Sequence, residues 1–262
     1  MISQNKRKML RLLEQKKRRD AEGLFVAEGR KTVGDLLRGG LTCTYLAGTA
    51  ERLGELEAEL RGGRTEVAEA SAEELAEVSA LQTRSELIGI FRKPEMEEPV
   101  ASADELILAL DEIQDPGNLG TIIRTADWFG IRTMVCSTRC ADAYGPKAVQ
   151  ATMGALSRVR VHYTNLGRWL ERNGTEWHAP VMGTYLDGEN MYRTALPTGG
   201  VVLMGNEGHG IDPTLAPYVT HKLLIPSYPM GCATSESLNV STATAVVVSE
   251  LRRRRVVGVI IN

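Results

Sequence analysis

Three segments of the sequence carry the polar residues best suited to chemistry. The first, DEIQDPGNLGTIIRT (111–125), holds an asparagine and a charged Arg124 in an otherwise apolar run. The second, GNEGHGID (205–212), places a glutamate among three glycines. The third, IPSYPMGCATSESLNVSTATA (225–245), brings a second asparagine to the start of a small-residue run. Such amide, carboxylate and guanidinium groups could orient a polar ligand and stabilise developing charge.

Each segment also has a simpler structural interpretation. Arg124 could form an i,i+3 ion pair with Asp127 on an exposed helix face. The second segment could be an ordinary glycine turn, since its GxxGxG order differs from the GxGxxG of dinucleotide-binding folds. Ser235 and Ser237 are good N-cap candidates, so the third segment could begin a capped, buried helix. Taken singly, the first two segments favour these simpler interpretations.

The elements that would position these segments alternate along the second part of the chain. Strands are predicted at 105–110, 132–137, 158–163, 181–185, 201–205 and 222–226, and helices near 118–129, 145–155, 166–172 and 237–254. Apolar strands that alternate with helices predict a mostly parallel sheet with helices on both faces. The three polar segments follow strands, and ligands bind beyond the carboxyl ends of parallel strands.

The first part of the chain predicts a smaller α/β unit. A basic amphipathic helix is expected over 3–20, and FVAEGRKTVGDLLRGG (25–40) reads as a strand, a turn and a helix. Strands are also expected at 43–48 and 86–92, with helical patterns around 50–60 and 71–78. The acidic, proline-containing run around 93–104 is typical of a linker. The predicted domains are therefore residues 1–95 and 105–262, joined by a linker at 96–104.

Composition narrows the function further. The net charge of −2 conceals basic clusters in residues 1–19 and at 252–255, which indicate contact with a polyanion unless they are solvated helix faces. The four cysteines form no CxxC pair and lie near no histidine cluster, so no metal site is expected. No apolar run approaches the ~18–20 residues of a membrane span. A reduced, cytoplasmic protein without a membrane segment is predicted.

Together the three segments resemble the SpoU family of RNA ribose 2′-O-methyltransferases, within the SPOUT class. The motifs NLGTIIRT, GNEGHG and IP…SLNVS stand in the family's order, and the resemblance covers about residues 105–255. It implies a deep trefoil knot, S-adenosylmethionine as cofactor, and a homodimer. KKRRDAEGLFVAEGRKTVGDLL (16–37) resembles the ribosomal-protein-like domain that grips structured RNA in many of these enzymes. Ribosomal RNA is then expected as substrate rather than transfer RNA.

The resemblance also implies roles for individual residues. Arg124 matches the family's catalytic arginine, and three further residues are expected at the reacting centre: Asn118, Glu207 and Asn239. Cofactor binding is expected from Gly205, Asn206, Ile225, Ser237 and Leu238. Substrate RNA is expected to contact Lys16, Arg18, Arg19 and Arg30. This chain carries extra residues between Ile225 and Leu238 relative to the family, which bears on the conformation of the cofactor loop.

The chemistry of Arg124 leaves two roles open. A free guanidinium stays protonated far above neutral pH, so electrostatic stabilisation of a ribose alkoxide fits it better than proton abstraction. His209 is a rival base but lies in a glycine-rich loop and has no family counterpart. Two other functions compete: a non-catalytic RNA-binding or ribosome-assembly protein of the same fold, and a nucleotide-dependent oxidoreductase. The oxidoreductase lacks its first-strand glycine fingerprint.

Overall fold

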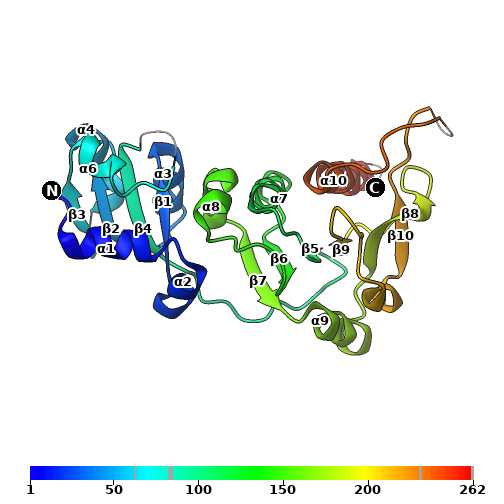
Figure 1. Ribbon diagram of the computed structural model, residues 1–262. Helices are drawn as coiled ribbons and strands as arrows, with labels where there is room; N and C mark the ends of the chain where they lie inside the picture. The colour runs from blue at the N-terminus through cyan, green and yellow to red at the C-terminus, as the bar shows by residue number, and fades with distance from the viewer. Residues whose placement is uncertain (62, 82–84, 230–231, 261–262) are drawn as a thin grey trace. The chain divides into compact units, whose positions relative to one another are not determined.

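The computed structural model describes residues 1–61, 63–81, 85–229 and 232–260 (Figure 1). Contacts divide the chain into two compact units. Unit 1 contains Met1–Glu95 and Asp142–Arg158, and unit 2 contains Met96–Ala141 and Val159–Asn262. Residues 142–158 therefore pack with unit 1, although they follow a strand of unit 2 in the chain.

Unit 1 is built on a four-stranded mixed sheet. Its strands are β1 Leu24–Glu28, β2 Cys43–Gly48, β3 Glu66–Glu69 and β4 Leu87–Arg92, in the order β1-β4-β2-β3. β4 is antiparallel to β1 and β2, while β2 and β3 are parallel. Its helices are α1 Gln4–Leu12, α2 Lys16–Glu22, α3 Arg30–Arg38, α4 Ala50–Gly54, α5 Glu57–Leu60, α6 Ala72–Ala76, α8 Pro146–Thr152 and the short 3-10 helix η1 Ala155–Ser157.

The expected helix over 3–20 is wrong, because the structure has two helices there. Gln15 adopts extended backbone dihedrals (φ −87°, ψ 127°) between α1 and α2. The Arg19 guanidinium donates from Nη1 to the carbonyl oxygens of Leu13 and Glu14, both at 2.7 Å. These are carbonyls at the break, where helical hydrogen bonds end. A tertiary contact of one buried arginine therefore stabilises the corner.

Unit 2 is built on a six-stranded sheet in which all neighbouring strands are parallel. The strands are β5 Leu106–Leu110, β6 Thr133–Ser137, β7 Arg160–Thr164, β8 Val181–Asn190, β9 Gly200–Met204 and β10 His221–Leu224, in the order β10-β8-β9-β5-β6-β7. Its helices are α7 Pro116–Trp128, α9 Leu166–Arg172, α10 Val240–Ile260, the π-helix η2 Asn173–Trp177 and the 3-10 helix η3 Pro213–Tyr218. The expected parallel α/β fold is confirmed.

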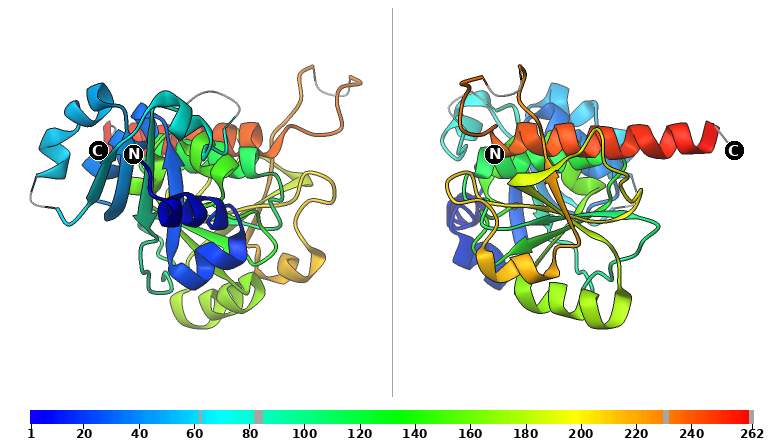
Figure 2. Two further views of the ribbon diagram at one scale, coloured as in Figure 1. Left: turned by 60° about the vertical axis from the view of Figure 1, so that its left-hand side comes forward. Right: turned by 90° about the vertical axis from the view of Figure 1, so that its right-hand side faces the viewer.

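Helices cover both faces of this sheet. α7 packs against α10 on one face, and α9 packs with η3 on the other (Figures 1 and 2). Ile107 and Ala109 of β5 belong to the same buried cluster as Trp169 of α9 and Leu215 of η3. Leu108, between them, is also fully buried and faces the α7–α10 layer, because successive strand residues point to opposite faces. Burial on both faces explains why the strands read as continuous apolar runs.

Candidate active site

The three polar segments lie at one edge of the unit 2 sheet. They follow β5, β9 and β10, which run parallel, so their carboxyl ends share that edge. Among the described residues, no helix is long and apolar enough to cross a bilayer, and no three metal-ligating side chains cluster.

The start of α7 brings Asn118 to this edge. Asp115 caps the helix, and its Oδ1 accepts a hydrogen bond from the backbone N–H of Asn118 at 2.8 Å. Pro116 occupies the first turn, where its missing N–H costs nothing. The half-buried Asn118 side chain donates from Nδ2 to Glu207 Oε1, in the loop after β9.

The start of α10 brings Asn239 to the same place. Its Oδ1 accepts from the backbone N–H groups of Ser241 (3.0 Å) and Thr242 (3.4 Å), so Asn239 caps this helix. Predicting the N-cap at Ser235 or Ser237 was wrong. An asparagine can cap with its oxygen and still donate from its nitrogen. Here Nδ2 donates to Asn118 Oδ1 (3.1 Å) and Glu207 Oε1 (3.0 Å).

Asn118, Glu207 and Asn239 thus form one hydrogen-bonded group, which we name the amide–carboxylate cluster. Glu207 Oε1 accepts from both amides. Its Oε2 makes no hydrogen bond with any described residue. The Glu207 and Asn239 side chains are exposed, so the cluster faces a ligand or solvent. Three residues predicted at the reacting centre are brought together from segments up to 121 positions apart.

Asn206 and Gly205 give the loop after β9 its shape. Asn206 Nδ2 donates to the Glu112 carbonyl at 2.8 Å, and Asn206 Oδ1 accepts from the Gly208 N–H at 2.7 Å. Backbone bonds of 2.9 Å in both directions pair Asn206 with Gly210. A Cβ on Gly205 would lie 2.2 Å from the backbone of Gly210, a contact that no side chain tolerates. Asn206, predicted to bind cofactor, has a clear role in holding the loop.

Arg124 lies on the exposed side of α7. Among the described residues, none makes a hydrogen bond or an ion pair with its guanidinium. The alternative ion pair with Asp127 is not formed, and Asp127 Oδ1 instead accepts from Arg132 Nη1 at 3.3 Å. A guanidinium held by no acid in the described structure is available to an anionic ligand.

The remaining predicted cofactor residues lie on the segment that leads into α10. Ile225 is half-buried and Ser237 is exposed, while the apolar Leu238 exposes 47% of its surface. An apolar side chain left open beside polar groups fits the adenine of an adenosyl cofactor, which would cover it. The insertion between Ile225 and Leu238 is described except for residues 230–231.

A buried carboxylate that the sequence motifs did not predict lies beside the loop after β9. Glu112 is 4% exposed and has a positive φ of 54°, unusual for a side chain of this size. Its carboxylate forms an ion pair with Arg139 and lies 3.7 Å from His209 Nε2. Two consecutive acids, Asp111 and Glu112, at the end of a buried strand were the available signal.

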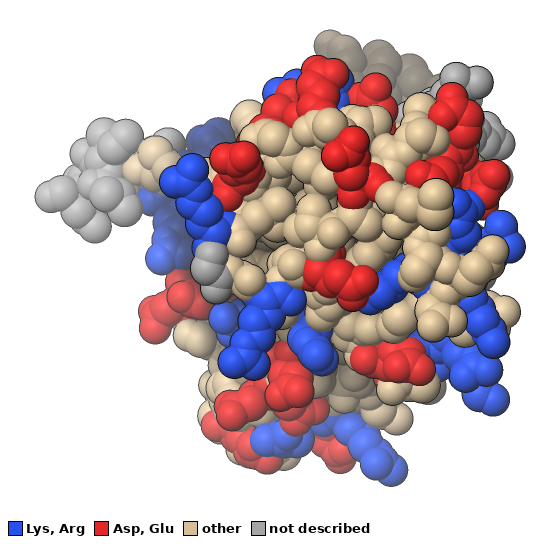
Figure 3. Space-filling model, turned by 90° about the vertical axis from the view of Figure 1, so that its left-hand side faces the viewer, with Lys and Arg blue, Asp and Glu red and all other residues tan. Residues whose placement is uncertain are grey.

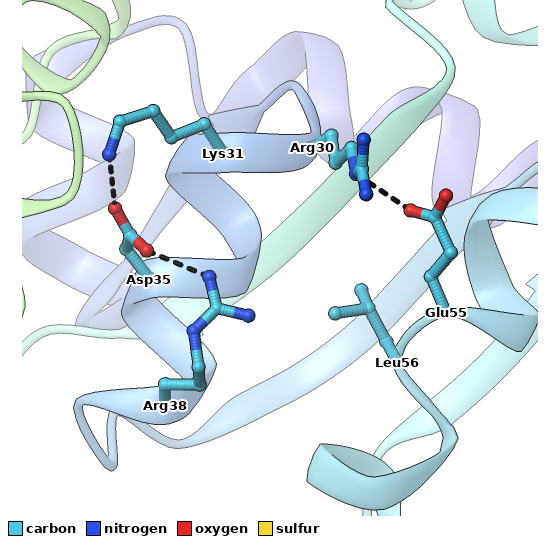
Figure 4. Close-up of a pocket in the computed structure, with 6 residues that line it drawn as sticks. All are labelled: Arg30, Lys31, Asp35, Arg38, Glu55 and Leu56. Carbon is cyan, nitrogen blue, oxygen red and sulfur yellow. Dashed lines mark hydrogen bonds and ion pairs between the residues drawn. The ribbon is translucent and has the colours of Figure 1, made fainter.

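The four predicted RNA-binding residues of unit 1 differ in exposure and in their partners. Lys16 and Arg18 are exposed. Arg30 pairs with Glu55 at 2.8 Å and lines a pocket of about 380 Å³ between α3 and the α4–α5 segment (Figure 4). Arg19 is 4% exposed and donates to Asp142 at 2.7 Å, so its burial does not fit an RNA contact. On the face shown in Figure 3, basic and acidic side chains are interspersed.

The basic run at 252–255 bonds mainly within unit 2. Arg252 donates to the Phe129 carbonyl at 2.7 Å, which caps the end of α7. Arg254 donates to the carbonyls of Met191 and Thr194, and Arg255 to that of Asp104 at 2.9 Å. These contacts favour a structural role over a polyanion site for this cluster.

The fold and the cluster define a parallel α/β protein with a ligand site at the carboxyl edge of its sheet. The SpoU rRNA Methylase family profile matches residues 105–249, and the MRM3-like substrate binding domain matches residues 4–89. The chain belongs to the SpoU rRNA methylase family. The predicted family and enzyme class, an rRNA ribose 2′-O-methyltransferase using S-adenosylmethionine, are confirmed at the level of the family.

Individual relatives support the assignment to this family. The chain is 33% identical over 183 residues to the Bacillus subtilis 23S rRNA (guanosine(2553)-2′-O)-methyltransferase RlmP, covering 70% of this chain and 71% of the relative. It is 34% identical to the Neisseria meningitidis 23S rRNA (guanosine-2′-O-)-methyltransferase RlmB, covering 59% of this chain and 61% of the relative.

Two solved structures cover almost the whole chain. One is a candidate RNA methyltransferase of the TrmH family from Porphyromonas gingivalis (TM-score 0.88, 40% identity, 97% of this chain and 99% of that one). The other is the AdoMet-bound rRNA methyltransferase from Sinorhizobium meliloti (TM-score 0.82, 29% identity, 97% of both chains).

Proposed function

We propose that this protein transfers a methyl group from S-adenosylmethionine to a ribose 2′-hydroxyl of ribosomal RNA. The observation that carries the proposal is the amide–carboxylate cluster, in which Asn118, Glu207 and Asn239 meet from three separate segments. A protein that only bound RNA would not need three loops joined by side-chain hydrogen bonds at a ligand edge. The rRNA targets named for the bacterial relatives support ribosomal RNA as the substrate class.

Arg124 acts on the substrate. Its exposed guanidinium binds a phosphate of the RNA and stabilises the oxygen of the 2′-hydroxyl as its proton passes to solvent water. A ribose hydroxyl is a very weak acid, so lowering the energy of the developing alkoxide assists the reaction directly. Because a guanidinium keeps its proton at neutral pH, this electrostatic role is preferred over that of a base.

The cluster positions the reactants. Two amides fix Glu207 through Oε1, which leaves Oε2 to accept a hydrogen bond from the substrate. Asn118 and Asn239 act through Glu207 as positioning residues. S-adenosylmethionine, when bound, supplies the methyl group. The cofactor is bound by the buried turn at Gly205 and by the apolar side chains of Ile225 and Leu238. The neighbouring Asn206 and Ser237 also contribute to this site.

Unit 1 recognises the RNA substrate. Lys16, Arg18 and Arg30 are its proposed phosphate contacts, whereas Arg19 is buried against Asp142 and does not reach the RNA. The match of residues 4–89 to a substrate binding domain supports this division of labour. The domains in sequence are then 1–95 and 105–262, joined by a linker at 96–104, with residues 142–158 of the second packing in unit 1.

A homodimer is proposed through the α7–α10 layer. Trp128 on α7 is 84% exposed and Val256 on α10 is 58% exposed. Val256 lies one turn beyond Arg252, which bonds Phe129, the neighbour of Trp128. Both residues therefore lie beside the junction that this bond makes between α7 and α10, and a second copy of the chain would cover their exposed side chains.

We also propose a knotted fold, action in the cytoplasm and a reaction without a metal ion. The deep trefoil knot of the family would involve the segments after β9 and β10, which the bond between Glu207 and Asn239 joins. The protein acts in the cytoplasm, where the rRNA of bacterial relatives is made. The transfer needs no metal ion, because its electrophile is already a charged sulfonium.

Calorimetry with S-adenosylhomocysteine tests the cofactor part of this proposal. We expect binding that weakens when Leu238 is changed to alanine, and that is lost in Gly205→Ala, whose Cβ would force the loop apart. Gly174→Ala is the matched control, since nothing lies within 4 Å of the added Cβ. Absence of binding to the folded wild-type protein would refute the proposed function.

A further inference from the structure

A second polar pocket lies in unit 2 at the carboxyl ends of β5, β6 and β7. Its volume is about 200 Å³. Its lining includes Asp111, Ser137, Arg139, Leu166, Asp212 and Leu215. None of the residues predicted to bind cofactor or to act at the reacting centre lines it.

The pocket lies where ligand sites form in open parallel sheets. β5 leads to α7 on one face of the sheet, whereas β9 leads to η3 on the other (Figure 2). Neighbouring parallel strands whose connections leave in opposite directions open a crevice between them, and Asp111 after β5 and Asp212 after β9 both line the pocket. The pocket also lies near the amide–carboxylate cluster, because the carbonyl oxygen of Glu112, next to Asp111, accepts a hydrogen bond at 2.8 Å from Asn206, the chain neighbour of Glu207.

Asp111 is the acceptor in this pocket. It is 3% exposed, and its Oδ2 accepts from the backbone N–H of Asp212 at 2.9 Å. Its Oδ1 makes no hydrogen bond with any described residue. A carboxylate oxygen that opens to a pocket and has no partner among the described residues is free to accept a hydrogen bond from a ligand that donates.

Arg139 is the donor at the rim. Its Nη2 pairs with Glu112 and lies 3.7 Å from Asp212 Oδ2. These carboxylates hold the guanidinium at the pocket, and Nε and Nη1 make no hydrogen bond with described residues. The apolar Leu166 and Leu215, both buried, supply walls against which a flat ring can pack.

The chemistry of the pocket selects its ligand. Two carboxylates, Asp111 and Asp212, disfavour a phosphate, and Arg139 disfavours a free cation. The ligand is therefore neutral, with donors beside an acceptor. A volume below the ~300–1,000 Å³ of sites for larger ligands suits one flat ring system.

We propose that this pocket binds a guanine base of the RNA substrate. Guanine carries the N1–H and N2–H₂ donors next to the O6 acceptor, which complement Asp111 and Arg139. Adenine would turn its N1 acceptor toward the carboxylate, and the pyrimidines offer fewer donors along one edge. This inference rests on the proposed function, because it names part of the substrate of the same enzyme.

Nucleoside titration of the protein saturated with S-adenosylhomocysteine tests the pocket. By ligand-observed NMR we expect guanosine to bind ~10-fold or more tightly than adenosine or uridine, the discrimination typical of one good pair of base contacts. Equal affinity for guanosine and adenosine, or no guanosine binding, would overturn the inference.

The variant Asp111→Asn sharpens the test. It replaces an acceptor by a donor of the same shape, so guanosine affinity should fall ~10-fold while adenosine affinity changes little. The matched control is Asp187→Asn, whose side chain is 72% exposed on the same unit and should change neither. Unchanged guanosine affinity in the folded Asp111 variant would contradict the proposal.

Two readouts separate this inference from the proposed function. S-adenosylhomocysteine affinity reports both folding and the cofactor site. If that ligand binds and guanosine does not, only the guanine pocket is wrong. If guanosine binding is abolished by S-adenosylhomocysteine, the pocket belongs to the cofactor, and the inference is again overturned. If the cofactor product never binds, the proposed function fails, and guanosine discrimination is measured in its absence.

Discussion

Asn239 Nδ2 lies 3.0 Å from Glu207 Oε1, so one side chain joins the start of α10 to the loop after β9. The same residue caps α10 through Oδ1. The oxygen of this side chain therefore stabilises the helix, and its nitrogen fixes the geometry of the site.

Substitution of Asn239 separates these two roles. Asn239→Ala removes both, and should lower the free energy of unfolding by about 1 kcal/mol and slow methyl transfer. Asn239→Asp keeps the cap but sets a carboxylate against Glu207, so stability should hold while transfer falls roughly tenfold or more. Urea denaturation measures the stability of both variants, and a methyl-transfer assay measures their activity. Equal transfer by Asn239→Asp and wild type would show that the bond to Glu207 is unimportant.

Arg252 should matter for stability and not for RNA affinity. Arg252→Ala leaves the Phe129 carbonyl at the end of α7 without its donor, which should cost roughly 1–2 kcal/mol of unfolding free energy. The control is Arg168→Ala on the exposed side of α9. Filter binding to 23S rRNA at several salt concentrations should give the same affinity and salt dependence for both variants. A selective loss of RNA affinity in Arg252→Ala would favour the polyanion interpretation.

Glu250 gives the fold a pH dependence of known sign. Hydrogen bonds from Arg253, with those from Arg254, outweigh burial and lower the pKa of Glu250 from 4.5 to about 2. Because the folded pKa is depressed, the stabilisation is fully present above about pH 4.5 and is lost as pH falls toward 2.

The variant Glu250→Gln measures that contribution. Above pH 5 it should be less stable than wild type by about 2 kcal/mol, as expected for hydrogen bonds to a charged group. The difference should shrink as pH falls below about 4.5. Denaturation curves at pH 7 and pH 3 provide the comparison, with the exposed Glu171→Gln as control. A difference that stays constant between the two pH values would contradict the assignment.

Trp128 tests the proposed dimer. Trp128→Glu places a charge in the centre of the α7–α10 face and should convert the dimer to a monomer without unfolding the chain, since the side chain is 84% exposed. Light scattering coupled to size exclusion reports the mass. Thr175→Glu, exposed on η2, which packs with α9 on the opposite face of the sheet, should leave the dimer intact. A monomeric wild-type protein, or a dimeric Trp128→Glu variant, would refute this interface.

Much of the unit 2 fold could be predicted, because each strand buried on both faces leaves an unbroken apolar run. Less of the site could be predicted from the sequence. Asn118, Glu207 and Asn239 could be named through the family motifs, yet residue type alone did not distinguish Asn239 from Ser235 or Ser237 as the cap. Only the folded structure shows that the Asn239 side chain both caps α10 and donates a hydrogen bond to Glu207.

Other features depend on contacts that no local pattern encodes. The break between α1 and α2 is stabilised by Arg19, whose partner Asp142 is 123 positions away. Residues 142–158 join unit 1 through that ion pair and through Tyr144, whose ring centroid lies 5.1 Å from that of Phe25. The Glu112 carboxylate contacts Arg139 and His209, which belong to two other loops, and no local pattern predicts these contacts.

Methyl transfer by Arg124→Ala tests the central claim most directly. Labelled S-adenosylmethionine and rRNA from cells lacking the protein serve as substrates, and ribose methylation is mapped by resistance to alkaline cleavage. Wild type should introduce a 2′-O-methyl group. Arg124→Ala should lose transfer by a factor of about 100 or more, as expected for loss of a transition-state charge contact, with unchanged S-adenosylhomocysteine affinity. Undiminished transfer by this variant, or no ribose methylation by wild type, would contradict the account.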